Sequence, residues 1–326
     1  MKSLKSFSPF LILIPLTLSA CSLFAAGNVE INSTSVNNSY NNTKANQNSS
    51  DLAQIDDKLY YHYTNRFGAS EYYEIGNSYS KKINVDRNIS FDNIYKGKLL
   101  DINSDLIKEY NSEQNEWTAR DDIKLPDNVS NYRISACGDT LYLETYEELY
   151  RCSGNEFQKW VTSKDLGVQI DLSKMYIDGD IIYYHKEKDS SDSFCRFDTK
   201  SKQSEEVDVG NISLVTGFIE HDDRVYYLNE SETLHQVDFN TKKVKKLFGS
   251  GSGAMLFDLC GDTLCVAVQF SDTGIYISKN NGDFEKISDA DADSLYIVDE
   301  IYIYYTAEEG KLFRVSVDGK KEEQVH

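Results

Sequence analysis

The sequence has few of the residues that catalytic and metal-binding motifs require. No Cys-x-x-Cys pair occurs among its six cysteines, which argues against a zinc site or a thioredoxin-like redox centre. The five histidines are scattered, and arginine is sparse and does not cluster as a sialidase-type site requires. From these absences we predict no catalytic residues, no cofactor and no enzymatic activity.

Positive charge is also scarce. The chain has 34 Lys and Arg residues against 53 Asp and Glu residues, a formal net charge of −19. Such a chain is repelled by nucleic acid and by anionic lipid headgroups. The nearest basic run, residues 242–246, falls on a predicted hairpin, where a solvated edge strand is expected. We therefore predict that nucleic acid is not a partner.

The sequence does contain a short motif that recurs about every 40 residues. An Asp-containing turn is followed by a β-branched residue or leucine and then usually by tyrosine, as in residues 179–184 (Gly-Asp-Ile-Ile-Tyr-Tyr). The first apolar positions of the copies are Leu59, Leu99, Leu141, Ile182, Val225, Leu264 and Ile301. The steps between them are 40, 42, 41, 43, 39 and 37 residues, a period typical of one four-stranded propeller blade.

A second set of equivalent positions in the repeats supports the same architecture. Asp198, Asp238, Ser278 and Ser316 each follow a short apolar strand, and turn-forming residues come next, which predicts a hairpin from the third strand of each repeat to the fourth. The second strands are runs of consecutive apolar and aromatic residues, typical of strands covered on both faces. We predict an all-β β-propeller of four-stranded antiparallel blades. Seven copies favour seven blades, and six remain possible.

The amino terminus predicts an anchor. Lys2 and Lys5 precede a short apolar stretch, and residues 18–20 (Leu-Ser-Ala) place small residues directly before Cys21, as in the bacterial lipobox. Residues 1–20 are therefore interpreted as a lipoprotein signal peptide and Cys21 as the lipidated first residue of the mature chain. The alternative is an ordinary secretory signal with a chance cysteine. The membrane, reached through the lipid on Cys21, is thus a predicted partner.

The remaining chain divides into two parts. Residues 21–50 consist of Cys21 and a stretch rich in Asn, Ser and Thr, which cannot bury enough apolar surface to fold and is interpreted as a flexible tether. Residues 51–326 hold all seven copies of the repeat and form the predicted propeller domain. We therefore expect an extracytoplasmic protein, lipid-anchored to the bacterial cell membrane.

Two local patterns imitate functional motifs. Asp289, Asp291 and Asp293 have the carboxylate spacing of a calcium loop, but Ser294 stands where that loop needs glycine. These residues are kept as a candidate, although no metal site is predicted. The glycine-rich stretch at residues 249–254 imitates a dinucleotide fingerprint, yet a strand pattern follows it where phosphate binding needs a helix.

The repeats also carry a family resemblance. Residues 178–184 (Asp-Gly-Asp-Ile-Ile-Tyr-Tyr) and 311–319 (Lys-Leu-Phe-Arg-Val-Ser-Val-Asp-Gly) resemble a Tyr-rich β-propeller repeat family of unknown function in Firmicute surface lipoproteins. That family is similar to the YWTD propeller of low-density-lipoprotein receptors. The resemblance covers roughly residues 52–326 and implies the fold. The chain lacks the Tyr-Trp-Thr-Asp motif itself, and the receptor propellers have six blades.

Two classes of function follow from these observations. The favoured one is a membrane-anchored binding or scaffold module whose loops on one ring face recognise a protein or a glycan. The alternative is a carbohydrate-active propeller enzyme with carboxylates at the central channel. The ligand-binding residues are unknown at this level, because no motif marks them.

Overall fold

The computed structural model describes most of the predicted propeller domain. It covers residues 52–326, except for residues 56–57, 65–68, 77–79, 84–93, 97, 104–105, 112, 115, 128, 138, 189–190, 211, 213–214, 230, 250–253, 271, 299–300 and 309. The predicted signal peptide, Cys21 and the tether lie outside the described residues. No helix in the described part of the chain is long and apolar enough to cross a membrane.

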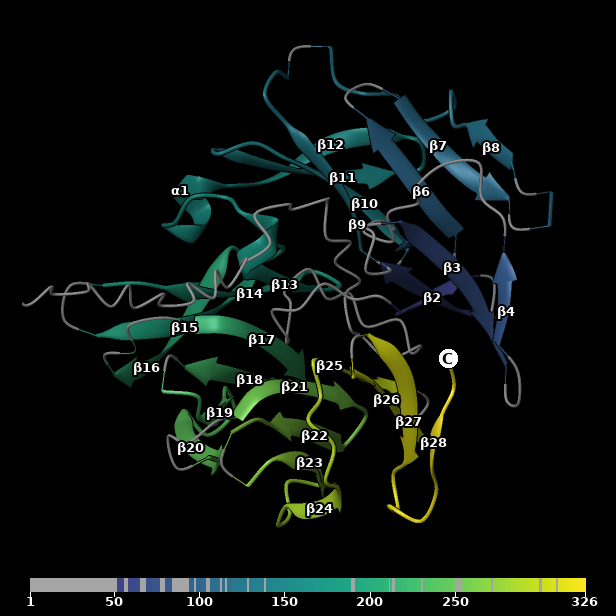
Figure 1. The fold of residues 1–326 in the computed structure, drawn as a ribbon. Helices are drawn as coiled ribbons and strands as arrows, with labels where there is room; N and C mark the ends of the chain where they lie inside the picture. The colour runs from purple at the N-terminus through teal and green to yellow at the C-terminus, as the bar shows by residue number, and fades with distance from the viewer. Residues whose placement is uncertain are drawn as a thin grey trace, which may run out of the picture.

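Seven sheets of four strands make up the fold (Figure 1). The first blade contains β1 (Leu52–Ile55), β2 (Lys58–Thr64), β3 (Ser70–Ile75) and β4 (Ser80–Ile83). The second contains β5 (Ile94–Tyr95), β6 (Lys98–Asn103), β7 (Leu106–Asn111) and β8 (Glu116–Ala119). The third contains β9 (Arg133–Cys137), β10 (Thr140–Glu144), β11 (Glu148–Ser153) and β12 (Glu156–Thr162). The helix α1 (Ser163–Leu166) and the 3-10 helix η1 (Leu172–Lys174) lead to the next blade.

The other four blades follow the same plan. The fourth contains β13 (Met175–Asp178), β14 (Ile181–Lys186), β15 (Asp192–Asp198) and β16 (Gln203–Gly210). The fifth contains β17 (Val215–His221), β18 (Arg224–Asn229), β19 (Leu234–Asp238) and β20 (Lys243–Phe248). The sixth contains β21 (Ala254–Cys260), β22 (Thr263–Val268), β23 (Gly274–Lys279) and β24 (Glu285–Ser288). The seventh contains β25 (Ser294–Val298), β26 (Tyr302–Ala307), β27 (Lys311–Ser316) and β28 (Glu322–Gln324).

These sheets confirm the predicted β-propeller and its seven blades. In every blade the strands pair antiparallel in chain order, so each blade is one continuous segment. The first strands lie nearest the axis, because β5 contacts β9, β13 contacts β17 and β21 contacts β25. The lysine-rich run at residues 243–246 lies on β20, the outermost strand of the fifth blade, and is exposed as expected.

The hydrophobic core lies between the blades. One cluster joins the second and third blades, a second joins the third and fourth, and a third extends from the fourth to the sixth. Further clusters join the sixth blade to the seventh and the seventh to the first. The third to seventh blades therefore bury both faces against their neighbours, which explains the consecutive apolar residues of their second strands.

Tyrosines of the second strands use their hydroxyl groups to connect neighbouring blades. Tyr183 donates a hydrogen bond to Asp223 Oδ1 of the fifth blade at 2.7 Å. The next residue, Tyr184, points the other way and donates to the carbonyl oxygen of Leu166 in α1, also at 2.7 Å. Both tyrosines are almost completely buried. A tyrosine can fill this space because its hydroxyl has a partner there.

The seventh copy of the repeat requires a correction. The sequence pattern predicts that Ile301 is the first apolar residue of the seventh copy of the motif. In the structure Ile301 is 56% exposed and lies in the turn between the register partners Val298 and Tyr302. Ile303 is completely buried and takes the position that Ile182 has in the fourth blade. The turn between the first two strands is one residue longer in the seventh blade than in the fourth. The motif is therefore displaced along the sequence relative to the buried positions, but the fold is unchanged.

The four cysteines whose side chains the structure describes, Cys152, Cys195, Cys260 and Cys265, are free thiols. The last three are buried, and burial raises the pKa of Cys265 well above its usual value. They pack as small apolar side chains, as the sequence predicts.

Candidate functional site

The antiparallel plan sorts the loops onto two ring faces. Connections from second to third strands, and from one blade to the next, share one face, which we call the pocket face; it includes residues 145–147 and 167–171. Turns from first to second strands and from third to fourth strands share the opposite face, which includes residues 179–180 and Ile301. Each loop is therefore placed by strand direction alone.

A cavity of about 360 Å³ opens on the pocket face at the junction of the third and fourth blades. It is lined by three segments, residues 131–133, 144–146 and 169–171. The first enters β9, the second leaves β10, and the third enters η1 and β13. Its volume lies near the lower end of the range of ligand pockets, which is about 300–1,000 Å³.

Glu144 is the buried acid among the residues that line this pocket. It is only 7% exposed and accepts a hydrogen bond from the backbone N–H of Leu172 at 2.6 Å. Its register partner Arg133 donates to the other carboxylate oxygen, and Arg133 also approaches Asp171 Oδ1 at 3.5 Å. Burial raises the pKa of Glu144, whereas the N–H of Leu172 and the Arg133 charge act to lower it.

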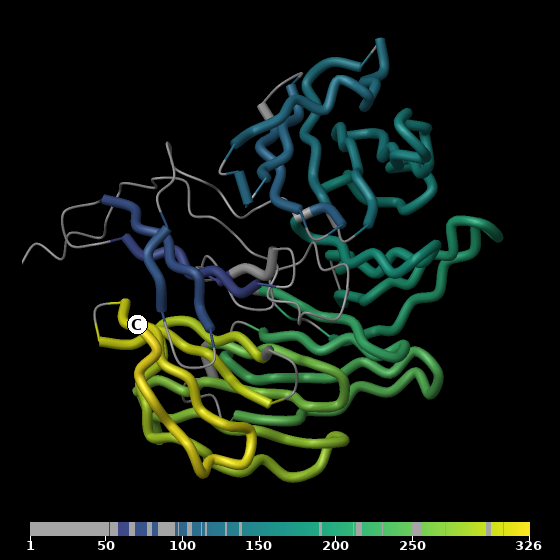
Figure 2. Tube along the Cα trace, turned by 90° about the vertical axis from the view of Figure 1, so that its right-hand side faces the viewer, coloured from purple at the N-terminus to yellow at the C-terminus, as the bar shows by residue number. Residues whose placement is uncertain are grey.

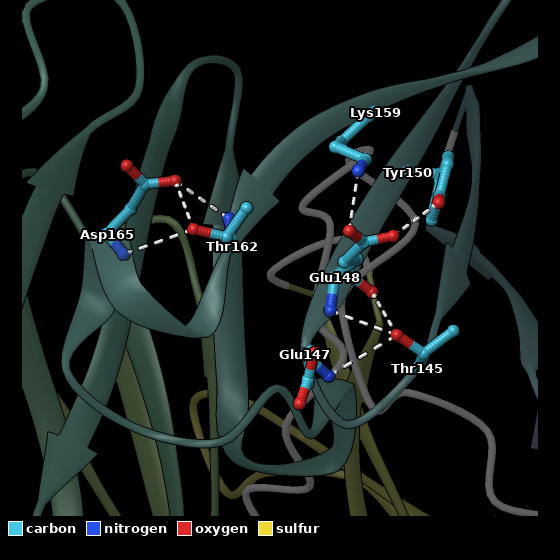
Figure 3. Close-up of polar contacts among 7 residues, drawn as sticks. All are labelled: Thr145, Glu147, Glu148, Tyr150, Lys159, Thr162 and Asp165. Atoms are coloured by element: carbon cyan, nitrogen blue, oxygen red, sulfur yellow. Dashed lines mark hydrogen bonds and ion pairs between the residues drawn. The ribbon is translucent and has the colours of Figure 1, made fainter.

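Tyr146 is the exposed aromatic residue of the pocket, with 74% of its surface accessible. The preceding residue, Thr145, fixes the loop, because its hydroxyl accepts hydrogen bonds from the N–H groups of Glu147 and Glu148 at 3.3 and 3.0 Å (Figure 3). The carbonyl oxygen of Tyr146 accepts from the N–H of Ile170 at 3.1 Å. A short loop thus holds an aromatic ring toward solvent on a fixed backbone.

The linker on the other side of the pocket is fixed as well. Thr162 and Asp165 form a capping box at the start of α1, each side chain accepting from the other residue's backbone N–H (Figure 3). The helix ends at Gly167, whose φ of 73° lies in the left-handed region that glycine adopts readily. Two of the three segments that line the pocket therefore belong to ordered connections.

The sequence contains one signal for Glu144 that motif reasoning missed. Three positions after the first apolar residue of each repeat, the second strand reaches the pocket face. This column contains His62, Ile102, Glu144, His185, Leu228, Ala267 and Thr306. Glu144 is its only carboxylate, so a buried acid at this level of the third blade could have been recognised. Nothing comparable marks Tyr146.

A second buried carboxyl lies near the opposite face. Glu220, at the end of β17, is 6% exposed and accepts from the N–H of Asp223 at 2.8 Å. Burial is the main cause that raises the pKa of Glu220 to about 8; the N–H of Asp223 acts to lower it, and the nearby charges of Asp178 and Asp223 act to raise it. Glu220 and Glu144 therefore belong to two separate places in the ring.

The calcium candidate is not assembled in the described structure. Asp289 is largely exposed and pairs with Lys286, with 2.7 Å between Oδ1 and Nζ. Burial and the neighbouring Asp291 raise the pKa of Asp293. Among the residues that the structure describes, no three His, Cys, Asp or Glu side chains lie close enough together to hold a metal ion.

Comparison with known proteins identifies the fold. No protein-family model and no curated protein matches the chain, so the resemblance to the Tyr-rich family stays a prediction. A puromycin-hydrolyzing peptidase from Mycobacterium tuberculosis matches with a TM-score of 0.54 and 10% identity, over 92% of this chain and 56% of its own. A puromycin hydrolase matches with a TM-score of 0.52 and 8% identity, over 88% of this chain and 55% of its own. BamB from Moraxella catarrhalis matches with a TM-score of 0.43 and 11% identity, over 84% of this chain and 87% of its own.

These similarities show a β-propeller, and the chain spans about half the length of the two peptidases. They correct the prediction that the chain is not an enzyme, because propellers of this fold occur within proteins that hydrolyse substrates. That prediction relied on missing linear motifs. Linear motifs do not reveal buried acids such as Glu144 and Glu220, whose pKa values are raised by burial.

Proposed function

We propose that this protein is a membrane-anchored extracytoplasmic lipoprotein whose propeller binds a protein or a glycan through the pocket face. The observation that carries the binding role is the cavity beside Tyr146, where an exposed aromatic ring stands on a backbone fixed by Thr145 and Ile170. Binding surfaces commonly combine a rigid scaffold with side chains on its loops. Large aromatic side chains supply much of the binding energy at such sites.

The anchor is supported by the lipobox pattern before Cys21. Replacement of this residue, Cys21→Ala, should abolish incorporation of labelled fatty acid and leave the chain unprocessed or released from the membrane. Cys152→Ala is the matched control, because Cys152 is a free thiol on β11, and it should be labelled like the wild type. Unchanged labelling and membrane retention of the Cys21 variant would refute the anchor.

The binding role can be tested with three variants, each of which truncates one exposed large hydrophobic side chain to alanine. Tyr146→Ala removes the aromatic ring at the pocket, Phe270→Ala removes one that is 82% exposed on the same face of the sixth blade, and Ile301→Ala changes the opposite face. The probes are a glycan array and isolated cell-surface proteins. We expect saturable binding that Tyr146→Ala weakens about tenfold and Ile301→Ala leaves unchanged. Binding that depends on Ile301 and not on Tyr146, or no saturable binding to either probe, would contradict the proposal.

A carbohydrate-active enzyme is the second candidate, and one observation favours it. Glu144 lines the pocket with a raised pKa, as a general acid for glycoside cleavage requires. Turnover of aryl glycosides should then disappear in Glu144→Gln and persist in Glu220→Gln, because Glu220 lies near the opposite face. Turnover that survives Glu144→Gln would exclude this acid from the chemistry.

A further inference from the structure

The one positive charge inside the pocket is fully compensated by neighbouring acids. Arg133 is the only basic residue among the lining segments, and its guanidinium group faces two acids, Glu144 and Asp171. The local balance is therefore one positive group against two acids, within a chain whose formal net charge is −19. An anionic ligand would meet no uncompensated positive charge here, and its entry would be opposed by the surrounding field.

The polar groups that remain available can both donate and accept hydrogen bonds. Asn131 and Gln169 line the pocket from two different linkers between blades, and both residues are exposed. Within the described part of the chain, neither side-chain amide makes a hydrogen bond, and Nη1 of Arg133 has no protein partner. Each amide offers N–H donors and a carbonyl acceptor. Such a pair matches hydroxyl groups, because each hydroxyl also donates and accepts.

Tyr146 adds an exposed apolar surface to this polar wall. Its ring is 74% exposed, while its backbone is fixed by the Ile170 N–H and by the turn at Thr145. A pyranose ring has an apolar face of C–H groups and an edge of hydroxyls, so it can lie on an aromatic ring while its edge reaches the amides. Little ordering entropy is lost because the loop is already in place.

The cavity also argues against a peptide as its occupant. Extended peptides commonly bind by adding a strand to an exposed sheet edge, with pockets for alternate side chains. Here the lining consists of loops and strand ends, and most of its side chains are polar. A volume of about 360 Å³ suits a ligand of about one or two sugar rings better than an extended chain.

We propose that this pocket binds a neutral saccharide, with Tyr146 stacked on a sugar ring and the side chains of Asn131, Gln169 and Arg133 hydrogen-bonded to its hydroxyl groups. The inference rests on the proposed binding function and narrows its ligand from a protein or glycan to an uncharged sugar.

The test is saturation-transfer NMR and calorimetry on the full chain with neutral disaccharides and with a matched uronic acid. The neutral sugars should bind with saturation, and the uronic acid should bind at least about tenfold more weakly.

Tyr146→Ala should lower the affinity for the neutral sugar about tenfold, whereas Tyr146→Phe should retain most of it because stacking needs only the ring. Gln169→Ala should lower it several-fold, and Ile301→Ala should leave it unchanged. Thermal unfolding midpoints equal to that of the wild type would show that each variant is folded.

The outcomes separate this inference from the proposed function. If a surface protein binds in a Tyr146-dependent way and no saccharide does, the saccharide inference is overturned and the binding function stands. Equal or tighter binding of the uronic acid would overturn the charge argument and with it the inference. If neither sugars nor proteins bind, both proposals fail.

Discussion

The imidazole ring of His326 lies 3.7 Å from the phenol ring of Tyr73, centroid to centroid, and so connects the seventh blade to the first. The same imidazole lies 5.8 Å from the ring of Tyr61, and its Nδ1 is 3.3 Å from Ser80 Oγ. The backbone of His326 pairs with Leu312 of β27, which holds the ring in this position. Figure 2 shows the C-terminal end of the chain, in yellow, beside the strands of the first blade, in purple and blue. Because no strand is shared between blades, the ring closes through side-chain packing.

Removal of the imidazole should weaken this closure. His326→Ala deletes the contacts with Tyr61 and Tyr73, and we expect it to lower the free energy of unfolding by about 1–2 kcal/mol. Chemical denaturation followed by tyrosine fluorescence would measure the change. The control Lys320→Ala alters a side chain that is 82% exposed in the same blade, and it should change stability little. Equal stability of His326→Ala and the wild type would show that closure does not depend on this contact.

His326 also predicts a sensitivity to acid. Burial lowers the pKa of His326 below its usual value of 6.5, so the unfolded chain binds the proton more tightly. The stability that the neutral ring contributes is full above about pH 6.5 and is lost as the pH falls through the lowered folded-state pKa. His326→Phe keeps a ring but removes the titration. Its unfolding midpoint should therefore fall less than that of the wild type between pH 7 and pH 5, and an identical fall would contradict the assignment.

Glu220 predicts the opposite trend. Its pKa of about 8 in the folded state lies above the usual value of 4.5, so the folded chain binds this proton more tightly. The resulting stability is full below about pH 4.5 and is lost as the pH rises to about 8. Glu220→Gln remains neutral and can still accept from the Asp223 N–H, so it should be more stable than the wild type above pH 8, by about 1–3 kcal/mol.

That difference should close as the pH approaches 4.5, because the wild-type acid is then protonated. The exposed Glu285 of β24 supplies the control Glu285→Gln, which should follow the wild type across the range. Urea denaturation at several pH values would separate the two variants. A constant offset between Glu220→Gln and the wild type at every pH would mean that Glu220 does not titrate in this window.

The sequence predicted the blades well because each blade is a local unit. Its four strands are adjacent in the chain, so one recurring turn motif and one set of equivalent buried positions are enough to place them. The weak point was the number of residues in the turns. One additional residue before Tyr302 moved the apparent repeat onto exposed Ile301 instead of buried Ile303.

The pocket was less predictable because it depends on contacts between blades. Glu144 and Leu172 are 28 residues apart, and their hydrogen bond exists only because the linker to the fourth blade passes over the end of β10. The burial that shifts the pKa of Glu144 has the same origin. Only its position as the single acid in a column with His62 and His185 was visible in the sequence.

The closed ring predicts that the blades depend on one another. A chain without residues 175–210 lacks the fourth blade, so the third and fifth blades lose the partners of their buried faces, including the bond from Tyr183 to Asp223. We expect loss of cooperative unfolding and binding of a dye that reports exposed apolar surface. Replacing the deleted segment by a second copy of residues 215–248 is the matched control, because it restores seven blades, and it should recover part of the cooperativity. Cooperative unfolding of the six-blade chain near the wild-type midpoint would instead indicate an open array, in which each repeat contacts only its neighbours and tolerates the loss of one.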